Sequence, residues 1–315
     1  MILPKLAYKK AKDLEDAIHL FRKYDENSFY LAGGTDLVPQ LKLRLHKPMA
    51  LIDLKGVADL KGIDVQESWL SIGANTTLFE LKDDPVVKEH FPALFQSLDA
   101  TSCETLQMRG TIGGNILQNT RCLFYNKSLE WRKAKGQCFK TDGEICNAVQ
   151  NSEMCFANYC SDNVPPLLTL SAEVILNGFG GERKINLSEI FSRDSKKPFR
   201  IMPGEILTRI LIPLKKSKGA FEKIRVRGSI DYPLVNAAVS VENGKGKLSI
   251  GGVGPVPFVY NLDNLDTYAV EELADRVYSD SRPVANTTLS ASYRKRMSKV
   301  LTKRIVANVL QEVQL

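Results

Sequence analysis

The sequence predicts an α+β protein built from two parts, and its patterning and glycine turns support this. Strand-like and helix-like segments are interspersed along the 315 residues, and two Gly-Gly turns, at Gly33-Gly34 and Gly113-Gly114, lie among them. From about residue 216 onward, short strand-like runs lead into a basic, helix-like end of the chain. The hydrophobic content of 43% and charged content of 25% are typical of a globular protein with a full core. A chain of this length corresponds to about two domains.

The first elements are a helix, a strand and a second helix. Apolar residues recur at helical spacing through residues 13–24, which predicts an amphipathic helix. The apolar run 29–32 predicts a strand, and the segment 37–45 predicts a helix after the first Gly-Gly turn. Thr35 or Asp36 is placed to cap the start of that helix.

The remaining elements follow from the same patterns. Residues 50–54 predict a strand, 60–75 predict a hairpin, and helical patterns lie around 78–81 and 91–98. Beyond an irregular stretch, strand-like runs occupy 167–179, 184–187, 206–214, 221–228, 234–242 and 246–254, ahead of a terminal helix. We expect the last of these runs and the terminal helix to form a small sheet with helices.

Composition excludes several classes of protein. No apolar run approaches the roughly 20 residues that cross a bilayer, and the basic N-terminus has no apolar stretch typical of a secretory signal, so we expect a cytoplasmic protein without a membrane partner. The net charge is +7. Its densest basic runs are 215–227 and 294–304, and the second has the spacing of a solvated helix face. No nucleic-acid-binding motif is present, so we expect no nucleic-acid partner.

The two Gly-Gly turns are candidates for binding a phosphate group. In LAGGTDL, residues 31–37, the glycines allow close backbone approach, and the following helix start favours an anion such as a pyrophosphate. TIGGN, residues 111–115, offers further donors to the same ligand. Each pattern alone occurs more often as a simple turn, with Asn115 as an ordinary helix cap. Neither is a Walker A loop or the G-x-G-x-x-G fingerprint. Together they predict a phosphate-containing ligand.

Five of the six cysteines lie between Cys122 and Cys160, where the hydrophobic periodicity fails. The stretch 121–160 therefore reads as an insertion that is held by something other than a hydrophobic core. Without a secretory signal, clustered thiols indicate metal or cluster ligands before disulfides. An iron–sulfur cluster, a structural zinc ion and inert thiols all remain open from spacing alone. Zinc sites favour closely spaced cysteine pairs, and the nearest pair here is Cys155 with Cys160.

Several motifs in one order resemble a known family, the FAD-binding subunits of molybdenum hydroxylases, which include xanthine dehydrogenase. They are AGGTDL at 32–37, TIGGNI at 111–116, SDNVPPLL at 161–168, GEIL at 204–207, and FEKIRVR with DYPLVNAAV within 221–239. The resemblance implies two α/β FAD-binding subdomains of the PCMH type, followed by a domain with a three-stranded sheet and helices. It implies an FAD-binding domain over 1–215, containing the iron–sulfur insertion 121–160, and a C-terminal domain over 216–315.

The resemblance also implies which residues bind FAD. They are Leu31, Ala32, Gly33, Gly34, Thr35, Asp36, Thr101, Thr111, Gly113, Gly114, Asn115, Asp162, Leu207, Lys223 and Tyr232. The two glycine loops would hold the pyrophosphate. Asp162 stands where the family has a carboxylate for the adenosine part, and Tyr232 is expected close to the isoalloxazine. No catalytic residue is expected, because the three histidines lie outside these motifs.

The insertion resembles one branch of the family, the β subunits of 4-hydroxybenzoyl-CoA reductases. That resemblance implies a 4Fe–4S cluster held by Cys122, Cys138, Cys146 and Cys155, with Cys160 left out. It implies an oxidoreductase subunit that transfers electrons during anaerobic degradation of aromatic compounds. The implied partners are a large molybdopterin subunit and a small subunit with 2Fe–2S clusters, in a dimer of heterotrimers. Reduced ferredoxin is the implied donor, and the net reaction converts 4-hydroxybenzoyl-CoA to benzoyl-CoA.

Two alternatives stand beside this interpretation. One is the FAD subunit of another molybdenum hydroxylase, passing electrons outward. The other is a basic binding protein stabilised by zinc and without redox activity. A docking patch for an acidic ferredoxin is a further hypothesis, formed by Trp131, Arg132, Lys133 and Lys135 in the insertion.

Overall fold

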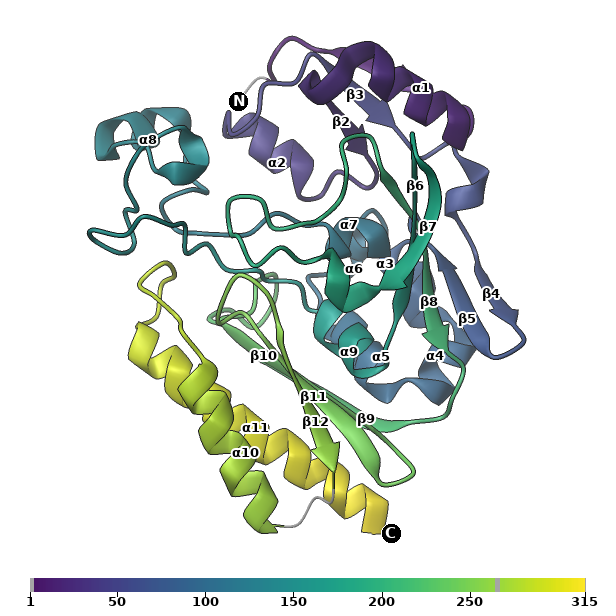
Figure 1. The fold of residues 1–315 in the computed structure, drawn as a ribbon, viewed down its shortest axis with the longest axis vertical. Coiled ribbons are helices and arrows are strands. Elements are labelled where there is room, and N and C mark those ends of the chain that lie inside the picture. The colour runs from purple at the N-terminus through teal and green to yellow at the C-terminus, as the bar shows by residue number, and fades with distance from the viewer. Residues whose placement is uncertain (1–2, 264–266, 315) are drawn as a thin grey trace.

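The computed structural model describes residues 3–263 and 267–314 and contains three sheets (Figure 1). The N-terminal sheet has the order β1-β3-β2 and is parallel. Its strands are β1 (Ala7–Lys10), β2 (Ser28–Leu31) and β3 (Ala50–Asp53). The connecting helices are α1 (Leu14–Tyr24) and α2 (Leu37–Lys42). The strands and helices predicted from the sequence in this region are confirmed.

The second sheet is antiparallel and has the order β4-β5-β8-β6-β7. Its strands are β4 (Ile63–Gln66), β5 (Trp69–Gly73), β6 (Glu173–Gly178), β7 (Gly181–Asn186) and β8 (Ile206–Pro213). The helices that accompany it are α3 (Leu78–Asp83), α4 (Pro85–His90), α5 (Pro92–Ala100), α6 (Glu104–Gln107), α7 (Ile112–Ile116) and α9 (Val164–Thr169). Apart from α6, which contacts α3, these helices contribute to the largest core cluster of the described chain, which includes Ile112 and Ile116 at the second glycine loop.

The C-terminal sheet has the order β12-β11-β10-β9 and is antiparallel. Its strands are β9 (Lys218–Ile224), β10 (Val235–Glu242), β11 (Lys245–Gly251) and β12 (Phe258–Asp263). The helices α10 (Thr267–Asp280) and α11 (Ala291–Gln314) pack on one face of it (Figure 1). The expected three-stranded sheet is therefore corrected to four strands, because the run after the Gly- and Pro-rich turn at 251–257 adds β12 to the edge.

Two further expectations need correction. Residues 167–169 were expected to begin a strand but instead end α9, because Pro165 and Pro166 occupy the first turn of this helix, where a proline ring fits without loss of a hydrogen bond. The insertion also contains regular structure. It includes α8 (Leu129–Lys135) and the short 3-10 helix Phe139–Thr141, and it projects to one side beside α2 (Figure 1).

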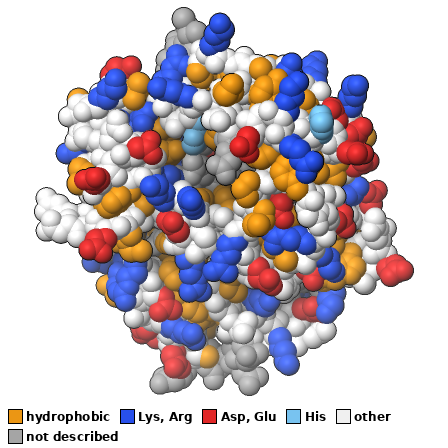
Figure 2. Space-filling view, turned by 45° about the horizontal axis from the view of Figure 1, so that its top comes forward, with side chains coloured by type: hydrophobic (Ala, Val, Ile, Leu, Met, Phe, Trp, Pro, Cys, Tyr) orange, Lys and Arg blue, Asp and Glu red, His pale blue; other side chains and the backbone are white. Residues whose placement is uncertain are grey.

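Charged side chains of both signs are interspersed on the face shown in Figure 2, with apolar side chains between them. On that face the basic side chains are not gathered into a single basic patch. Within residues 3–263 and 267–314, no helix combines the length and hydropathy that a membrane span needs.

Candidate functional site

The two glycine loops are in direct contact with each other. A Cβ atom added to Gly33 would lie 1.8 Å from the carbonyl oxygen of Arg109, just ahead of the second loop. Gly34 has a φ of +75°, a conformation that glycine adopts without strain. Only glycine at these two positions therefore lets the turn after β2 pack against the segment that leads into α7.

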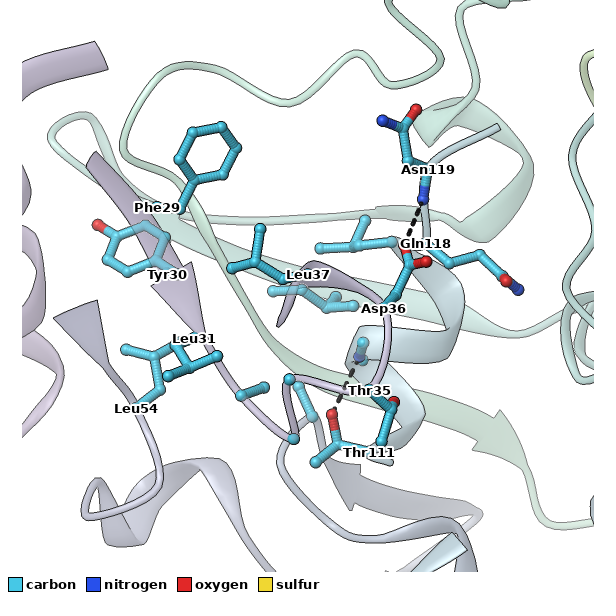
Figure 3. Close-up of a pocket in the computed structure, with 18 of the residues that line it drawn as sticks. Phe29, Tyr30, Leu31, Thr35, Asp36, Leu37, Leu54, Thr111, Gln118 and Asn119 are labelled. Carbon is cyan, nitrogen blue, oxygen red and sulfur yellow. Dashed lines mark hydrogen bonds between the residues drawn. The ribbon is translucent and has the colours of Figure 1, made fainter. Parts of the chain in front are cut away.

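The second loop is fixed by a cap and by the neighbouring sheet. Thr111 is the N-cap of α7, and its hydroxyl accepts a hydrogen bond from the backbone N–H of Gly114 at 3.1 Å (Figure 3). The N–H of Gly113 donates to the carbonyl of Ala74 at 2.9 Å. A Cβ at Gly113 would come within 2.8 Å of that same carbonyl oxygen.

Two cavities lie on either side of these loops. The larger one, of about 400 Å³, extends toward β2 and β8, and Figure 3 shows part of its lining. The smaller one, of about 130 Å³, extends toward the C-terminal sheet. Both cavities are lined by Thr35, Asp36, Thr111, Gly114 and Gln118. A ligand with its centre on the loops can therefore place one half in each cavity.

The structure brings the residues predicted to bind FAD together at these cavities. The larger cavity is lined by Leu31, Ala32, Gly33, Gly34, Thr35, Asp36, Thr111, Gly113, Gly114 and Leu207. The smaller cavity is lined by Thr35, Asp36, Thr101, Thr111, Gly114, Asn115, Asp162 and Tyr232. Asp162 and Tyr232 thus face the same cavity, although the sequence assigned them to opposite ends of the ligand.

Lys223 lies behind the smaller cavity and forms a buried ion pair with Asp162. The Nζ–Oδ2 distance is 2.7 Å, and the two side chains are 3% and 6% exposed. Asn236 donates a second hydrogen bond to Asp162 at 3.2 Å. Burial raises the pKa of the Asp162 carboxyl, and the charge of Lys223 opposes that rise. This buried ion pair therefore holds two opposite charges in fixed positions at the wall of the smaller cavity.

Thr35 or Asp36 was expected to cap α2; Asp36 occupies the N-cap position, but its side chain makes no capping hydrogen bond. Its carboxylate instead accepts hydrogen bonds from Gln40 Nε2 at 2.7 Å and from the Asn119 N–H at 3.2 Å (Figure 3). It also pairs with Arg121 at 3.4 Å. The Arg121 guanidinium lies 3.7 Å from the ring centroid of Tyr232, which links the first loop to the smaller cavity.

The insertion brings four thiols to one small cavity. Cys122, Cys138, Cys146 and Cys155 line it, together with aromatic side chains and Lys140. All six cysteines of the chain are free thiols. Burial raises the pKa of Cys122 to about 11 and also raises that of Cys155. Cys160 is buried in the smaller of the two loop cavities instead.

The spacing of the thiols is wider than that of a single-ion site. In the part of the chain that the structure describes, no three His, Cys, Asp or Glu side chains are close enough to hold one metal ion. A tetrahedral zinc ion binds thiolates at about 2.3 Å and so draws its ligands tightly together. A four-iron cluster holds one thiolate at each corner and accepts a wider spacing.

Lys140 lies between the cysteine cavity and the first loop. Its ammonium group donates to Asn119 Oδ1 at 2.6 Å and lies 4.5 Å from the ring centroid of Tyr125. Burial lowers the pKa of Lys140 to about 8, while the nearby thiols and Asp36 oppose the decrease. Sequence reasoning missed this residue, because a lysine in a polar segment gives no signal of burial.

Other residues at the site also escaped sequence reasoning. His46, for which a surface or capping role was expected, lines the larger cavity, bonds to Gln40 at 2.8 Å and packs on Phe29. Arg132 was expected in the docking patch but is buried. Its guanidinium donates to the carbonyls of Leu43 and Arg44, both at 3.0 Å, and so fastens α8 to the end of α2. The proposed patch therefore loses Arg132 and retains Trp131, Lys133 and Lys135 at the surface.

Comparison with known proteins gives consistent matches over the chain. Residues 4–215 match the family described as the FAD binding domain in molybdopterin dehydrogenase. The aldehyde oxidoreductase FAD-binding subunit PaoB of Escherichia coli is 28% identical over 298 residues, 90% of this chain and 91% of that protein. The glyceraldehyde dehydrogenase medium chain of Sulfolobus acidocaldarius is 27% identical, over 98% of this chain and 100% of that protein. In structure, a chain of the cyanide-inactivated Cu,Mo-CO dehydrogenase superposes with a TM-score of 0.76 and 25% identity over 98% of each chain.

Proposed function

The chain belongs to the family of FAD-binding domains of molybdopterin dehydrogenases, and from this premise we propose that it carries both FAD and a 4Fe–4S cluster in an electron-transfer subunit. The observation that carries the proposal is the convergence of four thiols on a cavity next to the FAD loops. Bound FAD supplies one- and two-electron redox chemistry, and the protein supplies its position and electrostatic surroundings.

The residues present fit FAD. The close contact at Gly33 and the left-handed Gly34 leave the loop backbone accessible to a pyrophosphate, while the two cavities accommodate the groups on either side of it. We assign Asp162, Lys223 and Tyr232 to the same half of the ligand, because they surround one cavity. Their roles are to hold a polar edge of the ligand and to keep a fixed pair of opposite charges beside it.

The residues present also fit a 4Fe–4S cluster. We propose Cys122, Cys138, Cys146 and Cys155 as its ligands, since these thiols line one cavity without forming a single-ion site. Cys160 is excluded because it faces the smaller loop cavity. The role of the insertion is then to hold the cluster close to the FAD loops.

We further propose that the whole enzyme removes the phenolic hydroxyl of 4-hydroxybenzoyl-CoA. Two electrons from two reduced ferredoxins and two protons would yield benzoyl-CoA and water, so the reaction balances. The substrate chemistry would take place in a large molybdopterin subunit, and electrons would reach it through a small subunit with 2Fe–2S clusters. The insertion carries the exposed Trp131, Lys133 and Lys135, which would form the contact with an acidic ferredoxin. We expect the complex, a dimer of heterotrimers, to work in the cytoplasm.

The test is to purify the complex without oxygen and to measure flavin, iron and acid-labile sulfide per heterotrimer. The proposal expects one FAD, and four irons beyond those of the 2Fe–2S subunit. Reduced ferredoxin should then drive formation of benzoyl-CoA from the hydroxylated thioester. A complex with FAD but without the additional irons would disprove the cluster. Full iron without turnover of the thioester would disprove the substrate alone.

A second candidate function is favoured by the names of the relatives. The two relatives described above are named as an aldehyde oxidoreductase subunit and a glyceraldehyde dehydrogenase chain. In that alternative, this chain would take electrons from an oxidised substrate and pass them outward to an acceptor. Oxidation of an aldehyde with a dye as acceptor, without activity toward the thioester, would favour it.

A further inference from the structure

The cysteine cavity and the larger FAD cavity are separated by one side-chain contact. Lys140 lines the cysteine cavity, and Asn119 lines the FAD cavity. The ammonium group of Lys140 donates to Asn119 Oδ1 at 2.6 Å, to Thr120 Oγ1 at 2.5 Å and to the Thr120 carbonyl at 3.1 Å. All three donor positions of the ammonium are therefore used to hold the segment 119–120.

Asn119 also forms hydrogen bonds to residues of the first glycine loop and of α2. Its backbone N–H donates to Asp36 Oδ2 at 3.2 Å, and its side-chain amide lies 3.4 Å from Gln40 Oε1. Gln40 in turn donates to the same Asp36 oxygen at 2.7 Å. The position of Asp36, and with it the loop at 33–36, thus depends on where Lys140 holds Asn119.

Within the described ranges, the ammonium group of Lys140 has no carboxylate at ion-pair distance, and the charge of Asp36 acts on it only from further away. Among the ion pairs of the described residues, none includes Lys140, although its surroundings are buried. A buried charge without a counter-charge is costly. The ring of Tyr125, 4.5 Å away, compensates only part of that cost. The four cysteines that line the same cavity would supply negative charge to it as thiolates, in addition to the charge of Asp36.

We infer that Lys140 is a positioning residue that couples the two cofactor sites, so that a negatively charged cluster on the cysteines strengthens the binding of FAD. The inference rests on the proposed function. Thiolates in the cavity fix the ammonium, the ammonium fixes Asn119, and Asn119 fixes the loop that meets the pyrophosphate. Because such coupling is reciprocal, bound FAD also strengthens retention of the cluster.

The test is a cycle of four FAD affinities measured on the full chain. The dissociation constant of FAD is determined for the wild type and for Lys140→Met, each with the cluster and after removal of iron with a chelator. Loss of iron should weaken FAD binding at least about fivefold in the wild type, a typical size for coupling between sites. In Lys140→Met, loss of iron should change it less than about twofold. Lys135→Met, on the exposed side of α8, removes the same charge and should behave like the wild type.

The design separates the possible failures. An equal effect of iron removal in the wild type and in Lys140→Met overturns the inference alone. Absence of iron from anaerobically purified wild type overturns the proposed cluster and the inference together. If Lys140→Met does not fold, Asn119→Ala breaks the same contact from the other side and should also abolish the effect of iron on FAD. A merely structural role for Lys140 would weaken FAD binding equally in both iron states.

Discussion

Replacement of Gly33 by alanine is the sharpest test of how the two loops meet. The added Cβ would lie 1.8 Å from the Arg109 carbonyl oxygen and 2.7 Å from its carbon. Ordinary contacts of this kind are longer than about 3 Å, so the loops must separate by roughly 1 Å. The obstructing atoms belong to the backbone, and no side-chain rotation relieves the overlap. We therefore expect a cost at the upper end of the usual range for overpacking, about 3 kcal/mol.

Two other glycine-to-alanine variants serve as controls for the loss of stability expected in Gly33→Ala. Gly34→Ala places a Cβ in tight contact with the side chains of Leu31 (3.1 Å) and Val38 (3.2 Å), at a φ of +75°, so it should cost about 1–2 kcal/mol. Gly180→Ala, in the turn between β6 and β7, adds a Cβ with no atom within 4 Å and should change stability by less than about 0.5 kcal/mol. The expected order of destabilisation is therefore Gly33, then Gly34, then Gly180.

The assay combines thermal unfolding with titration of FAD by fluorescence quenching. For a protein of 315 residues, about 3 kcal/mol corresponds to a decrease in Tm of roughly 4–5 °C. Gly33→Ala should also lose most of its FAD affinity, because separation of the loops moves the amides that meet the pyrophosphate. If its Tm and FAD affinity equal those of Gly180→Ala, the loops do not meet as described, and the assignment of the phosphate site is wrong.

The remaining predictions address the cysteines, the buried ion pair and an acid-sensitive contact. Cys138→Ser should lose most of the iron of this subunit, whereas Cys160→Ser should keep four irons; iron analysis giving the reverse would mean a different ligand set. Lys223→Met should lower the free energy of unfolding by about 3–5 kcal/mol because it leaves Asp162 buried without its partner, and the added Asp162→Asn change should recover much of that loss in denaturant titrations. Arg183 donates hydrogen bonds to Glu205 and so lowers the pKa of that carboxyl. The ionised Glu205 therefore stabilises the fold above its ordinary pKa of 4.5, and this stabilisation is lost as pH falls through the lower pKa of the folded protein. Between pH 5 and 3, the free energy of unfolding should therefore fall less in Glu205→Gln than in the wild type. An equal fall in both proteins, measured by urea titration, would contradict this.

Local patterns predicted the parts of the site that depend on neighbours in sequence. The strand, the glycine turn and the helix around Gly33 follow from apolar spacing and turn chemistry, and the structure contains them. Residues 167–169 at the end of α9 were mistaken for strand because a short apolar run does not distinguish the two structures. The family resemblance identified the residues at both cavities, which periodicity alone would not have found.

Interactions between distant segments were beyond sequence reasoning. The partners of the Asp36 carboxylate include Asn119 and Arg121, more than eighty residues further along the chain. Asp36 was expected to cap α2, because capping requires only the next few residues. Lys140 and Arg132 both occupy a polar stretch, where burial follows from how the insertion folds back on α2. Rules that apply to single segments do not predict this packing of the insertion on α2.

The two ends of the insertion lie side by side, at Arg121 and Asn158. Arg121 and Asn158 exchange backbone hydrogen bonds at 2.7 and 2.8 Å, which closes the intervening residues into a loop with a narrow neck. A segment with adjacent ends can be excised or grafted with little change to its host, because a short turn can replace it. We therefore expect that residues 122–157 can be exchanged for a tight turn to leave a folded protein without iron, which binds FAD more weakly because the contact of Lys140 with Asn119 is lost. If the same segment is inserted at the corresponding position of a relative, we expect it to bring the proposed cluster with it, provided that the host has an asparagine that can accept the hydrogen bond from Lys140.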